Sequence, residues 1–143
     1  MSKKVLIVED DKLSRKLAED LLQQQGYQTL SAKNGEEGVS LAKEHVPDLI
    51  IMDIKLPEIS GPEALTIIKA NKKLKHIPVI AATPFAMKGD EEKFLGQGFD
   101  AYIAKPYQFR EFLNLIDKIL KTEQKKKKVL GPFRFKLTHT QNF

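Results

Sequence analysis

Short apolar runs alternate along the chain with longer segments in which apolar residues recur every three or four positions. A short apolar run is typical of a strand buried on both faces, and the longer spacing is typical of an amphipathic helix. The runs predict five strands, at residues 5–8, 27–32, 49–53, 78–82 and 102–104. A helix is predicted after each strand.

Residues that start and stop helices support this division. Gly26 ends the first predicted helix and Pro47 closes the second. Capping boxes, in which two residues three positions apart bond each other's backbone at a helix start, are predicted for Asn34 with Glu37 and for Ser60 with Glu63. Apolar stripes mark the first and last helices, through Leu13, Leu17, Leu21 and Leu22, and through Phe109, Phe112, Leu113, Ile116, Ile119 and Leu120. The weakest helix signal lies between residues 87 and 98.

The alternation predicts an α/β fold, a doubly wound parallel sheet of five βα units. In such a sheet all strands end along one edge, where ligands bind. Polar residues follow or end four of the predicted strands: Glu9 and Asp10, Asp53, Thr83, and Lys105. Any one of these residues, taken alone, could equally be an ordinary solvated residue where a strand meets a loop. Together they indicate a functional site.

Three carboxylates at one edge of a sheet need a cation, a proton or a lysine nearby. Two carboxylates about 5 Å apart repel by roughly 3 kcal/mol at an effective dielectric of ~20. Mg²⁺ prefers oxygen ligands and leaves room for a phosphoryl oxygen. A carboxylate is also a phosphoryl nucleophile, and a lysine and a hydroxyl stabilise the transferred group. The edge therefore predicts phosphoryl chemistry with Mg²⁺.

Four short motifs carry a family resemblance: Val8-Glu9-Asp10, Met52-Asp53, Ala82-Thr83 and Lys105-Pro106. In this combination they resemble the receiver domain of two-component response regulators, over about residues 3–121. The resemblance implies a flavodoxin-like sheet with the strand order 2-1-3-4-5. Within the family, residues 56–61 and 85–92 are most similar to the single-domain DivK type.

The resemblance also implies the chemistry of the site. Asp53 is the expected phosphoacceptor, and Lys105 is expected to contact the phosphoryl group. The Lys105-Pro106 bond is expected to be cis. Mg²⁺ is expected to bind Glu9, Asp10, Asp53 and the backbone carbonyl of Lys55.

A switch is implied as well. Thr83 is expected to move toward the phosphoryl group while Tyr102 rotates inward, which changes the face formed by the fourth helix, fifth strand and fifth helix. Pro84 departs from the small residue usual in the family, restricts the backbone of Thr83 and lacks an N–H, so we expect a weaker switch. Lys55 and Phe85 are expected to tune the phosphoryl lifetime, and the apolar Phe85 favours a long one.

Charge is distributed unevenly along the chain. The net charge is +5, but residues 121–143 carry seven Lys or Arg and one acid, which leaves residues 1–120 at −1. We therefore predict a receiver domain at 1–121 and a disordered basic extension at 122–143, without a DNA-binding output domain. The 143 residues contain no cysteine, and the N-terminal apolar run is too short for a signal peptide or a membrane span, which indicates a cytoplasmic protein.

Three functional readings remain open. The first is a stand-alone response regulator, a monomer or weak dimer, which receives phosphate from a histidine kinase or phosphotransfer protein and signals through protein contacts. It would be no enzyme except toward its own phosphoryl group. The second is a Mg²⁺-dependent phosphohydrolase with an aspartate nucleophile. The third is a receiver-like binding module that works without phosphate.

Overall fold

The computed structural model describes the backbone of residues 2–84 and 89–129, with side chains through residue 121. Its strands are β1 (Lys4–Val8), β2 (Gln28–Ala32), β3 (Leu49–Asp53), β4 (Val79–Thr83) and β5 (Ala101–Ala104). Its helices are α1 (Lys12–Gln24), α2 (Gly35–His45), α3 (Gly61–Ala70), α4 (Asp90–Gln97) and α5 (Phe109–Val129). The alternation of strands and helices is the one predicted.

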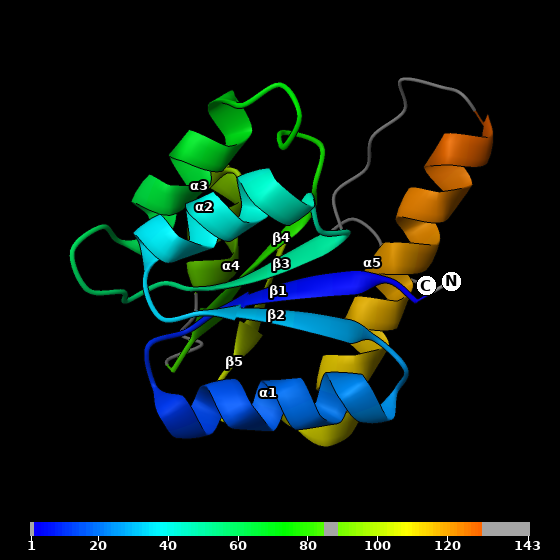
Figure 1. The fold of residues 1–143 in the computed structure, drawn as a ribbon, viewed down its shortest axis with the longest axis horizontal. Helices are drawn as coiled ribbons and strands as arrows, with labels where there is room; N and C mark the ends of the chain where they lie inside the picture. Colours follow the sequence, from blue (N-terminus) through cyan, green and yellow to red (C-terminus); the bar gives the residue numbers. More distant parts are fainter. Residues whose placement is uncertain (1, 85–88, 130–143) are drawn as a thin grey trace.

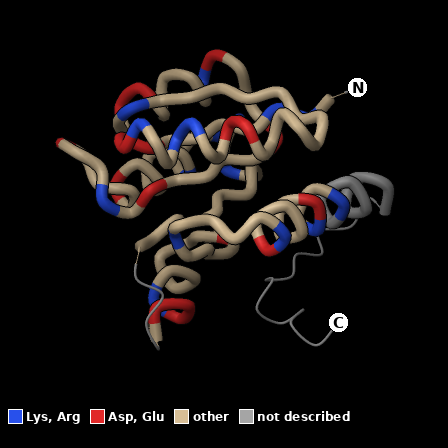
Figure 2. Tube along the Cα trace, turned by 90° about the horizontal axis from the view of Figure 1, so that it is seen from below, with Lys and Arg blue, Asp and Glu red and all other residues tan. Residues whose placement is uncertain are grey.

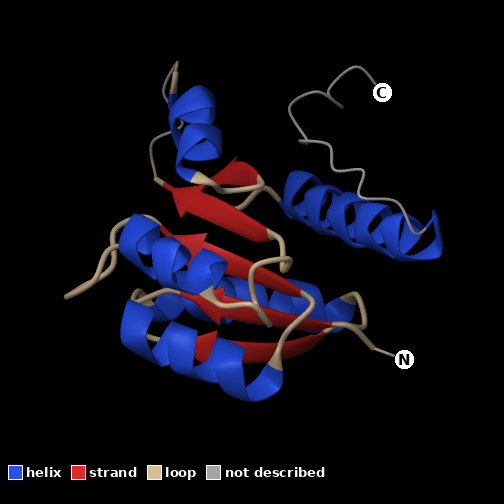
Figure 3. Cartoon of the chain, turned by 90° about the horizontal axis from the view of Figure 1, so that it is seen from above, coloured by secondary structure: helices blue, strands red, loops and turns tan. Residues whose placement is uncertain are grey.

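All strand pairs are parallel, and the strand order is β2-β1-β3-β4-β5, which confirms the predicted topology. The helices cover both faces of the sheet (Figure 1), and the strand arrows point the same way (Figure 3). All five strands therefore end along one edge of the sheet.

The central strand β3 is buried along its whole length. Leu49 and Ile51 pack into a core with α1 and α5, whereas Ile50 and Met52 pack into a second core with α2, α3 and α4. Because successive side chains of a strand point to opposite faces, an uninterrupted apolar run is required here.

The apolar stripe of α1 lies on the predicted helix but is only partly buried. Ala18, Leu21 and Leu22 are buried, but the side chain of Leu13 is 80% exposed and that of Leu17 is 39% exposed. At 100° per residue, Leu13 points roughly 130° away from the centre of the buried arc. Phe109, predicted in the stripe of α5, is also exposed at the first turn of that helix.

The helix boundaries are largely the predicted ones. Ser60 and Glu63 form the complete capping box of α3. At α2 only half of the box forms, because the Glu37 N–H donates to Asn34 while the Glu37 carboxylate accepts from the Lys33 N–H at 2.6 Å. Helix α5 continues to Val129, eight residues past the predicted domain boundary. Among the described residues, no helix is both long and apolar enough to span a membrane.

Candidate functional site

Three buried polar or charged side chains occur in the described part of the chain, and all three lie where the strands end. They are Glu9, directly after β1, Asp53, the last residue of β3, and Thr83, the last residue of β4. β1 and β4 flank β3 in the sheet, so the fold gathers residues that are far apart in the sequence. Burying two carboxylates is costly unless other groups compensate for their charge.

Lys105, directly after β5, provides that compensation. Its Nζ donates to Glu9 Oε1 at 2.7 Å and lies 3.3 Å from Asp53 Oδ2. Burial by itself lowers the pKa of Lys105, but the hydrogen bond to Glu9 and the charges of Asp53 and Glu9 raise the pKa overall. One ammonium group thus joins the ends of three strands. The backbone N–H of Lys105 also donates to the Thr83 carbonyl at 2.8 Å.

A single lysine does not balance the acids completely. Burial, and then the neighbouring carboxyl of Glu9, raise the pKa of Asp53 to about 7, against the opposing effects of Lys105 and the Lys55 N–H. Carboxylate oxygens of Glu9, Asp10 and Asp53 all lie within 4.8 Å of one another, and the Asp10 side chain is exposed. An all-oxygen set of this kind, with an excess of negative charge and one open side, fits Mg²⁺.

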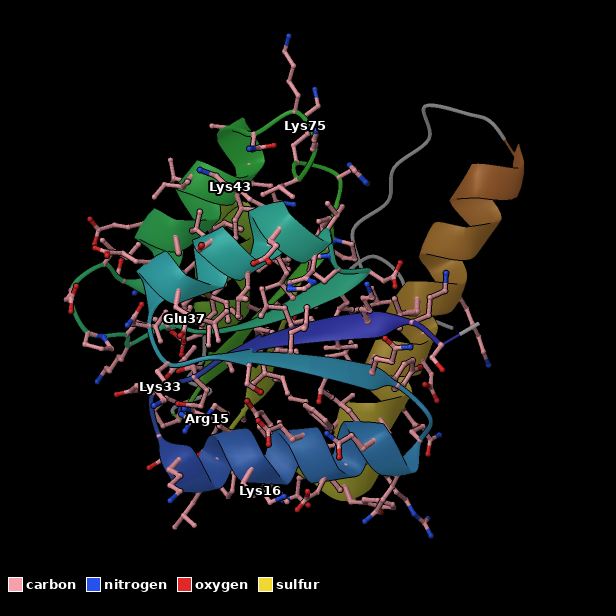
Figure 4. All side chains as sticks on the ribbon, in the orientation of Figure 1. Arg15, Lys16, Lys33, Glu37, Lys43 and Lys75 are labelled. Atoms are coloured by element: carbon pink, nitrogen blue, oxygen red, sulfur yellow. The ribbon has the colours of Figure 1, made fainter. Side chains whose placement is uncertain are left out.

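Backbone hydrogen bonds orient the acids. The Lys55 N–H donates to Asp53 Oδ1 at 3.2 Å, and the Asp11 N–H donates to Glu9 Oε2 at 3.2 Å. Arg15, labelled in Figure 4 beside the edge where the strands end, donates from one Nη to the Glu9 carbonyl at 2.9 Å. We did not predict a role for Arg15, because only the turn between β1 and α1 brings it back to the backbone of this loop.

Two further residues near Asp53 were not predicted. A Cβ built on Gly61 would lie 2.4 Å from the Asp53 carbonyl oxygen, so only glycine fits where α3 begins. The sequence signal was present, since a glycine stands between Ser60 and Pro62 at a helix start. Tyr107 is buried against Phe112, with ring centroids 4.5 Å apart, and burial followed by the acidic charges raises the pKa of its hydroxyl.

The predicted switch residues lie on adjacent strands. Tyr102 is half-buried on β5, with its ring centroid 6.1 Å from that of Phe94 on α4. Burial, and then the acids at the start of α4, raise the pKa of the Tyr102 hydroxyl. Pro84 is exposed directly after Thr83, and Phe85 lies outside the described residues. The Lys105-Pro106 bond is cis, as expected.

Comparison with known proteins gives a consistent assignment. Residues 5–117 match the response regulator receiver domain family. The polar-differentiation response regulator DivK of Brucella anthropi is 51% identical over 120 residues, which cover 84% of this chain and 98% of DivK.

Solved structures agree. The receiver domain of the sensor histidine kinase PA1611 from Pseudomonas aeruginosa, which has a magnesium ion coordinated in its active-site cleft, is 30% identical with a TM-score of 0.78, covering 85% of this chain and 99% of that one. The receiver domain of a LuxO repressor protein from Vibrio parahaemolyticus shares the fold, with a TM-score of 0.82 at 24% identity over 92% and 99% of the chains. The chain therefore belongs to the response regulator receiver domain family and is similar to its single-domain DivK members.

Proposed function

We propose that Asp53 accepts a phosphoryl group from a histidine kinase or a phosphotransfer protein and that the phosphorylated domain signals through protein contacts. The observation that carries this proposal is the buried Asp53 carboxylate held between Lys105 and the Lys55 N–H. The similarity to DivK over nearly all of that protein's length supports a stand-alone regulator.

Mg²⁺ fits the acidic set described above, and Glu9, Asp10, Asp53 and the Lys55 carbonyl would hold it. When bound, it supplies positive charge that neutralises the acids and the phosphoryl oxygens. The similarity to a receiver with magnesium in its cleft supports this part of the proposal.

Residues of the chain itself then carry out the transfer. An Asp53 carboxylate oxygen attacks phosphorus and forms an acyl phosphate, while the bond between phosphorus and the donor's imidazole nitrogen breaks and its electron pair stays on that nitrogen. Lys105, 3.3 Å from Asp53 Oδ2, neutralises a phosphoryl oxygen, and the Thr83 hydroxyl hydrogen-bonds another. The domain catalyses only the gain and loss of its own phosphoryl group.

The exposed leucines of α1 give the donor a place to bind. The Leu13 side chain is 80% exposed. It lies two residues after Asp11, whose carboxylate accepts a hydrogen bond from the Ser14 N–H and caps α1 next to the acidic cluster. Leu17 is exposed one turn further along the same helix. A donor protein that covers these side chains would bring its phosphohistidine to the open side of the site.

Output through α4, β5 and α5 follows from the positions of Thr83 and Tyr102. Movement of Thr83 toward the phosphoryl group would vacate space into which Tyr102 rotates, and Tyr102 contacts α4 through Phe94. Pro84 restricts Thr83 and weakens this response. Lys55, two residues after Asp53, and Phe85 would set the lifetime of the acyl phosphate, which we propose to be long.

Location, oligomeric state and the C-terminal segment belong to the same proposal. A cytoplasmic location fits a donor that draws its phosphoryl group from ATP. The domain would act as a monomer or weak dimer, and the basic segment that begins at residue 122 would be an extension outside the receiver. Figure 2 shows acidic and basic residues interspersed along the described helices, so no nucleic-acid surface is proposed for the receiver itself.

The test is to incubate the protein with Mg²⁺ and acetyl phosphate and to measure its intact mass. We expect an adduct of one phosphoryl group in the wild type and in Asp20→Asn, a control at an exposed carboxylate on α1, and none in Asp53→Asn. Turnover of small phosphate esters without an adduct would favour the phosphohydrolase. The absence of both adduct and turnover would favour the phosphate-independent module.

A further inference from the structure

Helix α2 begins with two glycines that leave no room for a side chain. A Cβ built on Gly35 would lie 2.5 Å from Ile59 Cγ1 and 2.9 Å from Ile59 Cδ1. A Cβ built on Gly38 would lie 2.7 Å from Cγ2 of Val8, the residue before Glu9. Neither glycine is among those with positive φ. Both are therefore needed for space and not for backbone freedom.

Ile59 belongs to the loop from residue 54 to residue 60, which leaves the site directly after Asp53. Both ends of the loop are fixed, because the Gly61 N–H donates to the Ile54 carbonyl at 3.0 Å and Gly61 packs on the Asp53 carbonyl. Between these ends, Ile59 is half-buried and packs against the core of α2, α3 and α4. Its side chain lies against Gly35 and so joins the loop to the start of α2.

The residue next to Ile59 adds independent support. Glu58 has φ +68°, in the left-handed region, although it is neither glycine nor asparagine, and its side chain is exposed. A non-glycine residue keeps such a conformation only where its surroundings determine it. Ile59 directly follows Glu58, so the constrained backbone and the packed side chain are adjacent in the loop.

We propose that Ile59 is a positioning residue that, seated on Gly35, holds the loop so that the Lys55 backbone stays beside Asp53. The Lys55 N–H then reaches Asp53 Oδ1. This inference rests on the proposed function, because the Lys55 carbonyl is one of the ligands that we assign to Mg²⁺. It adds to that function a contact between α2 and the loop that sets metal affinity from outside the acidic cluster.

The test compares Gly35→Ala, Ile59→Ala and the double variant with Gly96→Ala, a control on α4 where an added Cβ meets nothing within 4 Å. The readouts are the Mg²⁺ dissociation constant and the amide NMR shift of Lys55 in Mg²⁺-free buffer. We expect each single variant to move the Lys55 amide signal and to weaken Mg²⁺ binding by roughly 10-fold, the scale for residues that support metal ligands. Gly96→Ala should change neither.

The double variant tests the contact itself. Ile59→Ala removes the two carbon atoms closest to the added Cβ and leaves the Ile59 carbonyl oxygen at 3.2 Å, so Gly35→Ala should weaken Mg²⁺ binding much less in that background than in the wild type. Wild-type Mg²⁺ affinity and an unmoved Lys55 amide signal in Ile59→Ala would overturn the inference. Ile59→Ala provides this test even if Gly35→Ala fails to fold. A wild type that binds no Mg²⁺ would contradict the proposed function instead, while the Lys55 signals in metal-free buffer would still test the role of Ile59.

Discussion

Replacing Asp53 with asparagine should make the metal-free protein more stable at pH 8. The wild-type pKa of Asp53 is raised from 3.8 to about 7, so between these values the folded state binds a proton that the unfolded state has lost. The free energy of unfolding therefore falls as pH rises from about 4 to 7 and stays reduced above 7. About 3 pKa units correspond to ~4 kcal/mol.

Asparagine has the shape of the carboxyl but no charge, so it removes this penalty. The ~4 kcal/mol is an upper value, and a gain of at least about 1 kcal/mol should appear as a rise of a few degrees in Tm. At pH 5 more than half of this gain should be lost, because the folded wild type is then protonated while the unfolded chain still ionises.

The assay is urea unfolding in EDTA at pH 8 and pH 5, followed by circular dichroism. Asp20→Asn, at an exposed carboxylate paired with Lys16, serves as the matched control and should stay close to the wild type. Mg²⁺ should reduce the advantage of Asp53→Asn because it stabilises the wild-type carboxylate. An Asp53→Asn variant that is no more stable than the wild type at pH 8 without metal would refute the reasoning.

Two further predictions concern partner contacts. Leu13→Ser should slow phosphoryl transfer from a donor protein by about 10-fold or more, the effect of losing ~1.4 kcal/mol of contact energy. Labelling by acetyl phosphate and the free energy of unfolding should not change, because the Leu13 side chain is exposed. Equal transfer rates in the variant and the wild type would count against donor binding on α1. Pro84→Ala should increase acetyl-phosphate labelling or partner affinity several-fold, because the Thr83 backbone is no longer restricted and residue 84 regains its N–H. No change in either measurement would show that Pro84 does not weaken the switch.

The sequence alone was sufficient for the order of the elements and for the edge at which the candidate site lies. The apolar run that ends at Asp53 had to be a strand covered on both faces, because an apolar residue occupies every position. Parallel strands then place Glu9, Thr83 and Lys105 at the same edge, and the family motifs supplied the strand order. Ser60 and Glu63 marked the start of α3 because the capping box is a local interaction.

Contacts between distant segments needed the tertiary structure. The spacing of Leu13 and Leu17 suits a helix, but only the packing of α1 decided which arc is buried. In the sequence, Gly35 is an ordinary residue at a helix start, and only the structure shows that Ile59, 24 positions later, packs against it. The pKa of Asp53 likewise depends on burial and on the position of Glu9, neither of which has a local signal. The sequence thus determined which groups share one edge of the sheet, because parallel strands all end there. The fold decided how closely these groups meet, because packing distances depend on the whole chain.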